Sequence, residues 1–273
     1  MLRLLFSVLF FFLLATTIEA HMLLPYTNDT YLDKPNDIEM RFVFIHPVIG
    51  GQPLDMGGIQ EFYALQKCAD LEVKKIDFKY KLKQIEWKNP DGKSNKAFAA
   101  SLTKKDLQNL GDYVFCIVPG YYYDEGANAY LQQITKLIMN VGGIRGNFNE
   151  PCGLPCEIVP LCKPYDLWEG NVFNGRVLSE GKPVPNAEIE VAYLNHKVNL
   201  SKNILQRRSR LDYPHRGLTT QTIYADDRGY FSFGLPEDGW WGFAALNVGP
   251  KTQHNGKDLS QDAVIWVQVV NVN

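Results

Sequence analysis

Apolar and polar side chains alternate along several short segments of this chain, which is the pattern of half-buried β-strands. In residues 38–45 the alternation places Ile38, Met40, Phe42 and Phe44 on one face. Alternation or a short apolar run predicts further strands at residues 78–82, 112–118, 170–178, 187–193, 219–225 and 230–233. The segment at 263–270 is apolar at almost every position, which favours a central strand buried on both faces.

Turn-forming residues separate these segments at intervals of roughly 8 to 12 positions. Clear turns fall at residues 89–92 (Asn-Pro-Asp-Gly) and 226–229 (Asp-Asp-Arg-Gly). Residues 130–141 fit a helical stripe as well as a strand, and we favour a strand because the surrounding segments are all β. Residues 195–217 read as a polar excursion. The sequence therefore predicts an all-β fold of sandwiches rather than a parallel sheet.

A proline-rich segment divides the chain. Residues 151–164 contain four prolines, a density that excludes a regular helix or a central strand. Apolar residues between the prolines predict a packed, extended connector rather than a free tether. The 273 residues are enough for two domains of ordinary size. The expected organisation is a signal peptide at 1–20, an N-terminal β-sandwich at 21–150, a connector at 151–169 and a C-terminal β-sandwich at 170–273.

The first twenty residues have the pattern of an export signal. Arg3 precedes an almost wholly apolar run at residues 4–14, which is too short to cross a bilayer. Ala20, with Ile18 two positions before it, predicts cleavage between Ala20 and His21. The alternative is an uncleaved anchor, in which His21 keeps an ordinary peptide nitrogen.

The charge balance argues against two kinds of partner. The chain carries 28 Lys and Arg against 30 Asp and Glu, a net charge of −2, and the leader contains one residue of each sign. Neither nucleic acid nor an anionic membrane surface is therefore expected as the main partner. Beyond the leader no apolar run reaches spanning length, which predicts a soluble mature chain. No Ser-His-Asp order, paired acid–base motif or phosphate-binding loop stands out.

Five cysteines follow the leader: Cys68, Cys116, Cys152, Cys156 and Cys162. In an exported chain the expectation is disulfides, and Cys152 and Cys156 are the easiest pair by sequence distance. The odd count leaves at least one thiol, and the spacing does not determine the connectivity. A zinc site at the last three cysteines is the alternative, but it lacks a fourth nearby ligand.

Candidate metal ligands gather around the mature N-terminus. If His21 begins the chain, its α-amine and imidazole can close a six-membered chelate ring on a metal ion. His46 follows the strand at 38–45 and could supply a third nitrogen, or it could simply hydrogen-bond to the backbone. Met56, in the glycine-rich loop at 50–58, could be a soft axial ligand or a packing residue. Nitrogen-rich sites of this kind suit Ni(II) and Cu(II) best.

Protons compete with a metal ion for these ligands. The reference pKa of an α-amine is about 7.7 to 8.0 and that of imidazole about 6.5, so affinity should fall as the medium acidifies. The other histidines, His196, His215 and His254, lie in polar segments and are expected to be solvated rather than ligands.

Three stretches resemble the DUF4198 family: residues 21–25, 151–173 and 239–247. The family groups exported proteins that are associated with nickel or cobalt uptake. Residues 181–187 and 227–231 also resemble carboxypeptidase-regulatory and transthyretin-like sandwiches, which implies a fold rather than a function. Together these resemblances cover nearly the whole mature chain and imply two β-sandwich domains of Ig-like or transthyretin-like type.

The family resemblance implies a metal site on the mature N-terminal His21, with His46 matching a His-Pro pair at a strand end. Members often carry a further histidine where this chain has Gln133, and some carry another in the loop at 50–58. The expected ligand set, His21, His46 and Met56, is therefore sparser than the family pattern.

The function implied by the resemblance is that of a non-catalytic periplasmic component, which binds nickel or cobalt and passes the ion to a membrane transporter. Two alternatives come from other classes. One is a copper-dependent oxidative enzyme, which would also use an N-terminal histidine and a second histidine on a sandwich. The other is a structural or ligand-binding sandwich without a metal.

Overall fold

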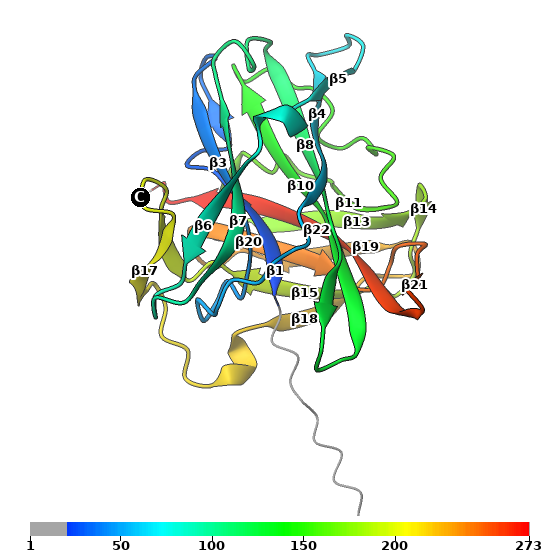
Figure 1. Ribbon diagram of the computed structural model, residues 1–273. Coiled ribbons are helices and arrows are strands. Elements are labelled where there is room, and N and C mark those ends of the chain that lie inside the picture. The colour runs from blue at the N-terminus through cyan, green and yellow to red at the C-terminus, as the bar shows by residue number, and fades with distance from the viewer. Residues whose placement is uncertain (1–20, 273) are drawn as a thin grey trace, which may run out of the picture.

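The computed structural model describes residues 21–272, which form three β-sheets (Figure 1). The first sheet has six strands in the order β1 (Met22–Tyr26), β3 (Ile38–Ile45), β7 (Ser94–Leu102), β6 (Lys83–Lys88), β17 (Ile204–Ser209) and β16 (His196–Asn199). The third has β11 (Cys156–Pro160), β13 (Val172–Ser179) and β14 (Lys182–Pro183), with β19 (Tyr230–Gly234) also paired to β13.

The second sheet, with twelve strands, lies between the other two. Its main path runs through β18 (Gln221–Tyr224), β15 (Glu188–Tyr193), β20 (Gly239–Ala245), β22 (Lys257–Val270), β10 (Ala129–Val141), β8 (Gly111–Pro119), β4 (Ile59–Lys67) and β5 (Lys74–Asp77). Four short strands pair with β10 or β22: β2 (Tyr31–Leu32), β9 (Tyr122–Asp124), β12 (Leu167–Trp168) and β21 (Gln253–His254).

Both faces of the central sheet are buried. Along β22, Val264 and Trp266 pack into the core shared with the six-stranded sheet, whereas Ala263, Ile265 and Val267 pack into the core shared with the four-stranded sheet. Successive side chains of a strand point to opposite faces, so a strand between two cores must be apolar at nearly every position. Residues 263–270 of β22 meet this requirement, as predicted.

The all-β prediction is confirmed over the described residues. Their helical elements are two single 3₁₀ turns, η1 (Lys79–Lys81) and η2 (Arg216–Leu218). No helix within residues 21–272 is long and apolar enough to cross a membrane. The ambiguous segment at 130–141 is the strand β10, as favoured from its surroundings.

Strands from both sides of the proline-rich segment share the central sheet. β10, which precedes the segment, pairs in parallel with the late strand β22, and Figure 1 shows the two side by side. The segment itself supplies β11 and β12, which pair with β13 and β22. The division into two domains at 151–169 stays a prediction. Residues from both sides of this segment contribute to the cores on the two faces of the central sheet.

Two expectations about individual elements were wrong. The strand expected at 78–82 is the turn η1, because Phe78 packs in the core at 1% exposure and the Asp77 carboxylate accepts the N–H of Lys79, at 2.8 Å. The polar excursion at 195–217 contains the hairpin of β16 and β17, which extends the first sheet by pairing with β6.

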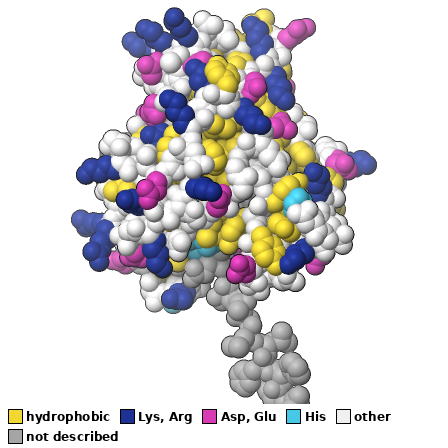
Figure 2. Space-filling model, in the orientation of Figure 1, with side chains coloured by type: hydrophobic (Ala, Val, Ile, Leu, Met, Phe, Trp, Pro, Cys, Tyr) yellow, Lys and Arg dark blue, Asp and Glu magenta, His cyan; other side chains and the backbone are white. Residues whose placement is uncertain are grey.

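On the face in Figure 2, basic and acidic side chains are interspersed, so the coloured part of that face shows no broad area of one sign.

Candidate metal site

The N-terminal strand β1 brings the first candidate ligand to the second. β1 pairs antiparallel with β3 in a register that sets Met22 opposite Ile45. One position further along, the same register places His21 opposite His46. Their ring centroids are 5.9 Å apart, and the rings meet edge to face at 78°. Two imidazoles that lie 25 positions apart in the sequence are therefore neighbours at one end of the first sheet.

The two rings differ in exposure. His46 is only 3% exposed, because the chain turns directly after β3 and the N–H of Gly50 donates to the His46 carbonyl at 3.1 Å. The N–H of Ile49 lies 3.5 Å from Nδ1 of His46, at the long limit of a hydrogen bond. His21 is half-buried, and its ring centroid lies 5.7 Å from that of Phe44. Approach to the pair is therefore easier from the His21 side.

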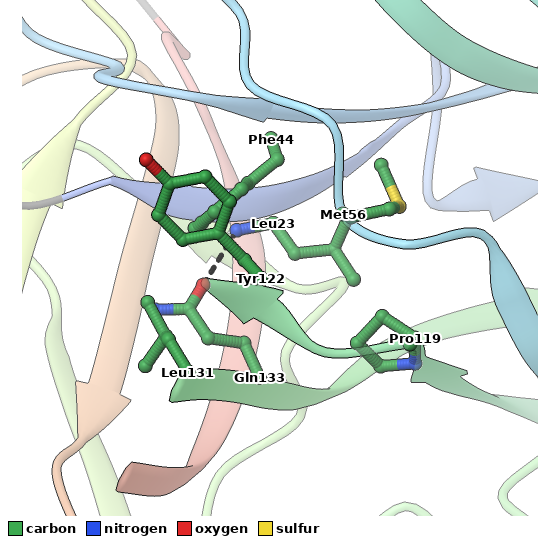
Figure 3. A pocket seen from close by; sticks show the side chains of 8 residues that line it. Leu23, Phe44, Met56, Pro119, Tyr122, Leu131 and Gln133 are labelled. Atoms are coloured by element: carbon green, nitrogen blue, oxygen red, sulfur yellow. Dashed lines mark hydrogen bonds between the residues drawn. The ribbon is translucent and has the colours of Figure 1, made fainter. Parts of the chain in front are cut away.

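Side chains of the central sheet hold the other edge of β1. The Gln133 carbonyl oxygen accepts the N–H of Leu23 at 2.7 Å (Figure 3), and its amide donates to the His21 carbonyl at 3.0 Å. The same amide lies 3.5 Å from the Asp262 carboxylate. The indole N–H of Trp266 donates to the Leu23 carbonyl at 2.9 Å. Among residues 21–272, no strand pairs with β1 on this side, and these bonds satisfy its backbone groups there. They thereby hold the backbone of His21 in place.

Met56 lies beside this strand in a small cavity. Its side chain is 3% exposed and belongs to the core between the first and central sheets. The cavity has a volume of about 10 Å³, roughly the least that accommodates one water molecule. It is lined by Leu23, Phe44, Met56, Pro119, Gly120, Tyr122, Leu131 and Gln133 (Figure 3). The mainly apolar lining fits a packing role for Met56, and its role as a ligand stays a prediction.

Two glycines hold the Met56 loop against the end of β8. A Cβ added to Gly120 would lie 2.1 Å from the carbonyl oxygen of Gly57, and the N–H of Gly120 donates to the Gly58 carbonyl at 2.9 Å. Gly57 also has a φ of +69°, which other residues adopt only with strain. The glycine-rich sequence of this loop is thereby explained by a close backbone approach, which places Met56 next to the site.

The donor set at the paired histidines is small. Within residues 21–272, no group of three or more His, Cys, Asp and Glu side chains is arranged to hold a metal ion. The two imidazoles are the candidate nitrogen ligands among the described side chains, and a cut before His21 would add its α-amine. That cut and the leader at 1–20 lie outside the described residues. Three nitrogens would suit Ni(II) or Cu(II), with water completing the coordination.

Comparison with protein families assigns the chain. The family model described as "Domain of unknown function (DUF4198)" matches residues 18–249, which is most of the chain. The chain belongs to the DUF4198 family. The comparison with curated proteins gives no match.

Gln133 supports the strand that follows His21 in this DUF4198 protein. The family resemblance implied a histidine at this position, and the Gln133 amide donates to the backbone carbonyl of His21. In this chain the position therefore supports β1 through hydrogen bonds. Sequence reasoning singled out Gln133 only as a departure from the family pattern and missed its bonds to the backbone.

Replacing Gln133 by alanine is expected to weaken Ni(II) binding by about 10-fold, the lower end of the loss caused by removing groups that orient a ligand. The substitution removes the bonds that fix Leu23 and His21. Calorimetric titration of the chain that begins at His21 measures the effect. Gln132→Ala is the matched control, since Gln132 is also buried and bonds to the Pro119 carbonyl at 2.8 Å. Equal losses of affinity in the two variants would contradict the proposed role of Gln133 in positioning His21.

Two acidic groups that the sequence analysis overlooked lie beyond Gln133. Asp262 is 1% exposed and accepts hydrogen bonds from the Asn247 N–H at 2.9 Å and the Ser260 hydroxyl at 2.6 Å. Burial raises the pKa of Asp262. Burial, then the charges of Asp262 and Glu188, raise the pKa of Glu190 to about 7. The sequence held one signal for Asp262, which is an acidic residue directly before the apolar run at 263–270.

Glu190→Gln is expected to stabilise the DUF4198 fold at pH 8 and to have little effect near pH 4.5. A raised pKa means that the folded chain holds this proton more tightly, so wild-type stability falls as the pH rises from about 4.5 through 7. Allowing for partial exposure, the gain at pH 8 is about 2 kcal/mol. Urea unfolding at the two pH values measures it. Glu86→Gln, at an exposed position on β6, is the control, and a pH-independent gain from Glu190→Gln would refute the cause.

Of the other histidines, two are less solvated than expected. His196 is 7% exposed, and its Nδ1 lies 3.0 Å from the Gln206 carbonyl oxygen. Burial lowers the pKa of His196. His254 is half-buried and stacks on Tyr121 with centroids 3.9 Å apart. His215 is exposed, as expected. His196 is thus held by a hydrogen bond with a backbone carbonyl, and His254 is held by stacking on an aromatic ring. Both contacts are structural.

A larger depression lies elsewhere on the surface, with a volume of about 540 Å³. Its charged lining includes Asp29, Asp37, Glu39 and Arg41. Arg41 binds Glu39 at 3.0 Å, and Asp37 accepts the N–H of Lys104 at 2.6 Å. Arg41, Glu39 and Asp37 are engaged within the protein itself, so we place the candidate site at the histidine pair.

Proposed function

We propose that this DUF4198 protein is a periplasmic metal-binding component of a nickel or cobalt uptake system, which delivers the ion to a membrane transporter without catalysing a reaction. The observation that carries the proposal is the pairing of His21 and His46, with ring centroids 5.9 Å apart. The nickel and cobalt association comes from the family resemblance, and the family itself is assigned by the match over residues 18–249.

The chemistry of the site suits a carrier. The α-amine and imidazole of a mature N-terminal His21 would chelate the ion, and His46 would add a third nitrogen from the neighbouring strand. Nitrogen ligands bind Ni(II), Co(II) and Cu(II) but compete with protons. A site with few protein ligands keeps coordination positions for water, and these are the positions through which a receiving transporter could take the ion.

The different exposure of the two imidazole rings also supports delivery of the ion to a partner protein. His46 is buried and is held by the turn that follows β3, so it provides a fixed ligand. His21 is half-buried at the beginning of β1, where an approaching partner could reach the chelate. Gln133 and Trp266 hold β1 in place, which lowers the entropy cost of ordering the site when the ion binds.

The test is titration of the chain that begins at His21 with Ni(II), Co(II) and Cu(II), followed by native mass spectrometry. One ion per chain is expected. His46→Gln should weaken binding at least as much as loss of a supporting group does, about 10- to 100-fold. His215→Gln, at an exposed position, should leave it unchanged. Absence of binding would favour the metal-free alternative, and oxygen-dependent polysaccharide cleavage by the copper-loaded chain would favour the enzyme.

A further inference from the structure

The cysteines do not form a second binding site. All five are free thiols in the structure, so the expectation of disulfides, with Cys152 and Cys156 as the easiest pair, was wrong. The Cys156 thiol is fully buried and lies 3.8 Å from the Gln261 carbonyl. Within residues 21–272 no three His, Cys, Asp and Glu side chains are arranged to hold a metal ion, which gives the zinc alternative no support. Oxygen-bearing side chains form a better candidate elsewhere.

The surface depression of about 540 Å³ lies between two segments that are far apart in the sequence. One runs from the end of β1 into the beginning of β3, and the other is the turn between β16 and β17. A volume of this size accommodates a small organic molecule. The lining combines carboxylates, amides and hydroxyls with the aliphatic side chains of Leu32, Ile38 and Leu200. A ligand that fits must therefore have both polar ends and apolar carbon atoms.

Long-range hydrogen bonds hold both segments in place. Arg41, on β3, donates to the side-chain oxygen of Asn203 at 2.7 Å and to the Leu200 carbonyl at 3.1 Å, so it ties the turn to the strand. The side-chain oxygen of Gln268, on β22, accepts the N–H and the hydroxyl of Thr30, at 2.9 and 3.1 Å. The walls of the depression are therefore formed before a ligand binds, which lowers the entropy cost of binding.

The charge of the lining is negative. It contains three carboxylates and one guanidinium, a formal charge of −2. Glu39 is paired with Arg41 at 3.0 Å. Asp37 accepts the N–H of Lys104 through one oxygen, at 2.6 Å, which orients the carboxylate but brings no positive charge to it. The Asp29 side chain makes no hydrogen bond or ion pair with another residue of the described chain. Asp29 and Asp37 are therefore the two carboxylates left for a cationic ligand.

A buried hydroxyl in the lining also calls for a ligand. Thr27 lines the depression and is only 1% exposed, yet its hydroxyl makes no hydrogen bond with another residue of the described chain. A buried hydroxyl without a partner costs free energy, and native proteins contain few such groups. A donor on a ligand in the depression would satisfy the Thr27 oxygen. An ammonium group has three N–H donors, so it can bond to a hydroxyl and to a carboxylate at once.

We propose that this depression binds an organic dication, an aliphatic diamine whose two ammonium groups pair with Asp29 and Asp37. The charge of −2 calls for two positive groups, and the aliphatic side chains suit the methylene groups between them. A single metal ion fits less well, because no three acidic side chains of residues 21–272 are arranged to hold one. The depression is not lined by His21 or His46, so the diamine and the metal ion occupy separate sites.

The test is calorimetric titration of the metal-free chain that begins at His21 with 1,3-diaminopropane, putrescine and cadaverine, at low ionic strength. One diamine per chain is expected, with an affinity that falls as salt is added. n-Butylamine, which has the carbon chain of putrescine but a single ammonium group, should bind about 5-fold more weakly. Because no metal is present, the result does not depend on the proposed metal-binding function. Absence of binding by all three diamines, or equal affinity for n-butylamine, would overturn the proposal.

Variants then locate the bound diamine. Asp29→Asn should weaken binding about 5-fold. Thr27→Val should weaken it about 10-fold without lowering the melting temperature, because the hydroxyl that it removes has no partner in the described chain. Asp33→Asn removes the same charge from an exposed position near the depression but outside its lining, and should change the affinity far less. Equal effects of Asp29→Asn and Asp33→Asn, or an unchanged affinity in Thr27→Val, would overturn the assignment of the site.

Discussion

A chain that carries five extra Gly and Ser residues before His21 is expected to bind Ni(II) about 100-fold more weakly than the chain that begins at His21, a loss of roughly 2.7 kcal/mol. The extension converts the α-amine into a peptide nitrogen, which does not bind the ion without losing its proton. The six-membered chelate ring is then lost, and the two imidazoles are left as separate ligands. Their geometry, with centroids 5.9 Å apart, is set by β1 and β3 and should persist.

Calorimetric titration at neutral pH measures the difference, and a protease site between the extension and His21 provides the control. Removing the extension from the same preparation should restore tight binding, which excludes damage during purification. An extension of five residues also avoids placing His21 at position two or three, where a new chelate could form. Equal affinity before and after cleavage would refute the amine-imidazole chelate and leave only the imidazole pair as a candidate.

Most of the β-strands could be predicted from the sequence. A strand with one face toward solvent alternates between polar and apolar residues, and a strand between two cores is apolar at nearly every position. Alternation identified β3, and an almost unbroken apolar run identified β22, whose side chains enter cores on both faces. The parallel pairing of β10 with β22 left no local signal, since it joins segments more than 100 positions apart. Lys79–Lys81 was misread because Phe78 and Leu82 fit a strand, while the local hydrogen bond from the Lys79 N–H to the Asp77 carboxylate favours a turn.

The candidate site was predictable in part, for a physical reason. His46 follows a strand that an alternating pattern predicts, and His21 follows the predicted signal cleavage point, so their identity as candidates follows from the sequence. Their contact depends on the register of β1 against β3, which backbone pairing and the bonds from Gln133 decide. Asp262 was missed because burial, which depends on the tertiary structure rather than on residue type, raises its pKa.

Lys136→Met is expected to destabilise the fold by about 3 to 5 kcal/mol, because it leaves the Glu157 carboxylate buried without its cation. Lys136 and Glu157 lie 2.7 Å apart, and both side chains are 1% exposed. Burial lowers the pKa of Lys136, but the charges of Cys152 and Glu157 outweigh it and raise the net value. The ammonium is therefore retained in the folded state. Urea unfolding of the reduced protein at neutral pH measures the loss.

Two further variants distinguish the loss of a partner from the loss of packing. Lys136→Met combined with Glu157→Gln removes both charges while keeping an acceptor for the N–H of Cys152, and it should recover much of the stability. Lys163→Met breaks the exposed pair with Asp166, whose side chains are 46% and 48% exposed, and should cost less than about 1 kcal/mol. If Lys136→Met were no more harmful than Lys163→Met, the unpaired carboxylate would have to be reached by water. The buried pair would then contribute little to the junction between β10 and β11.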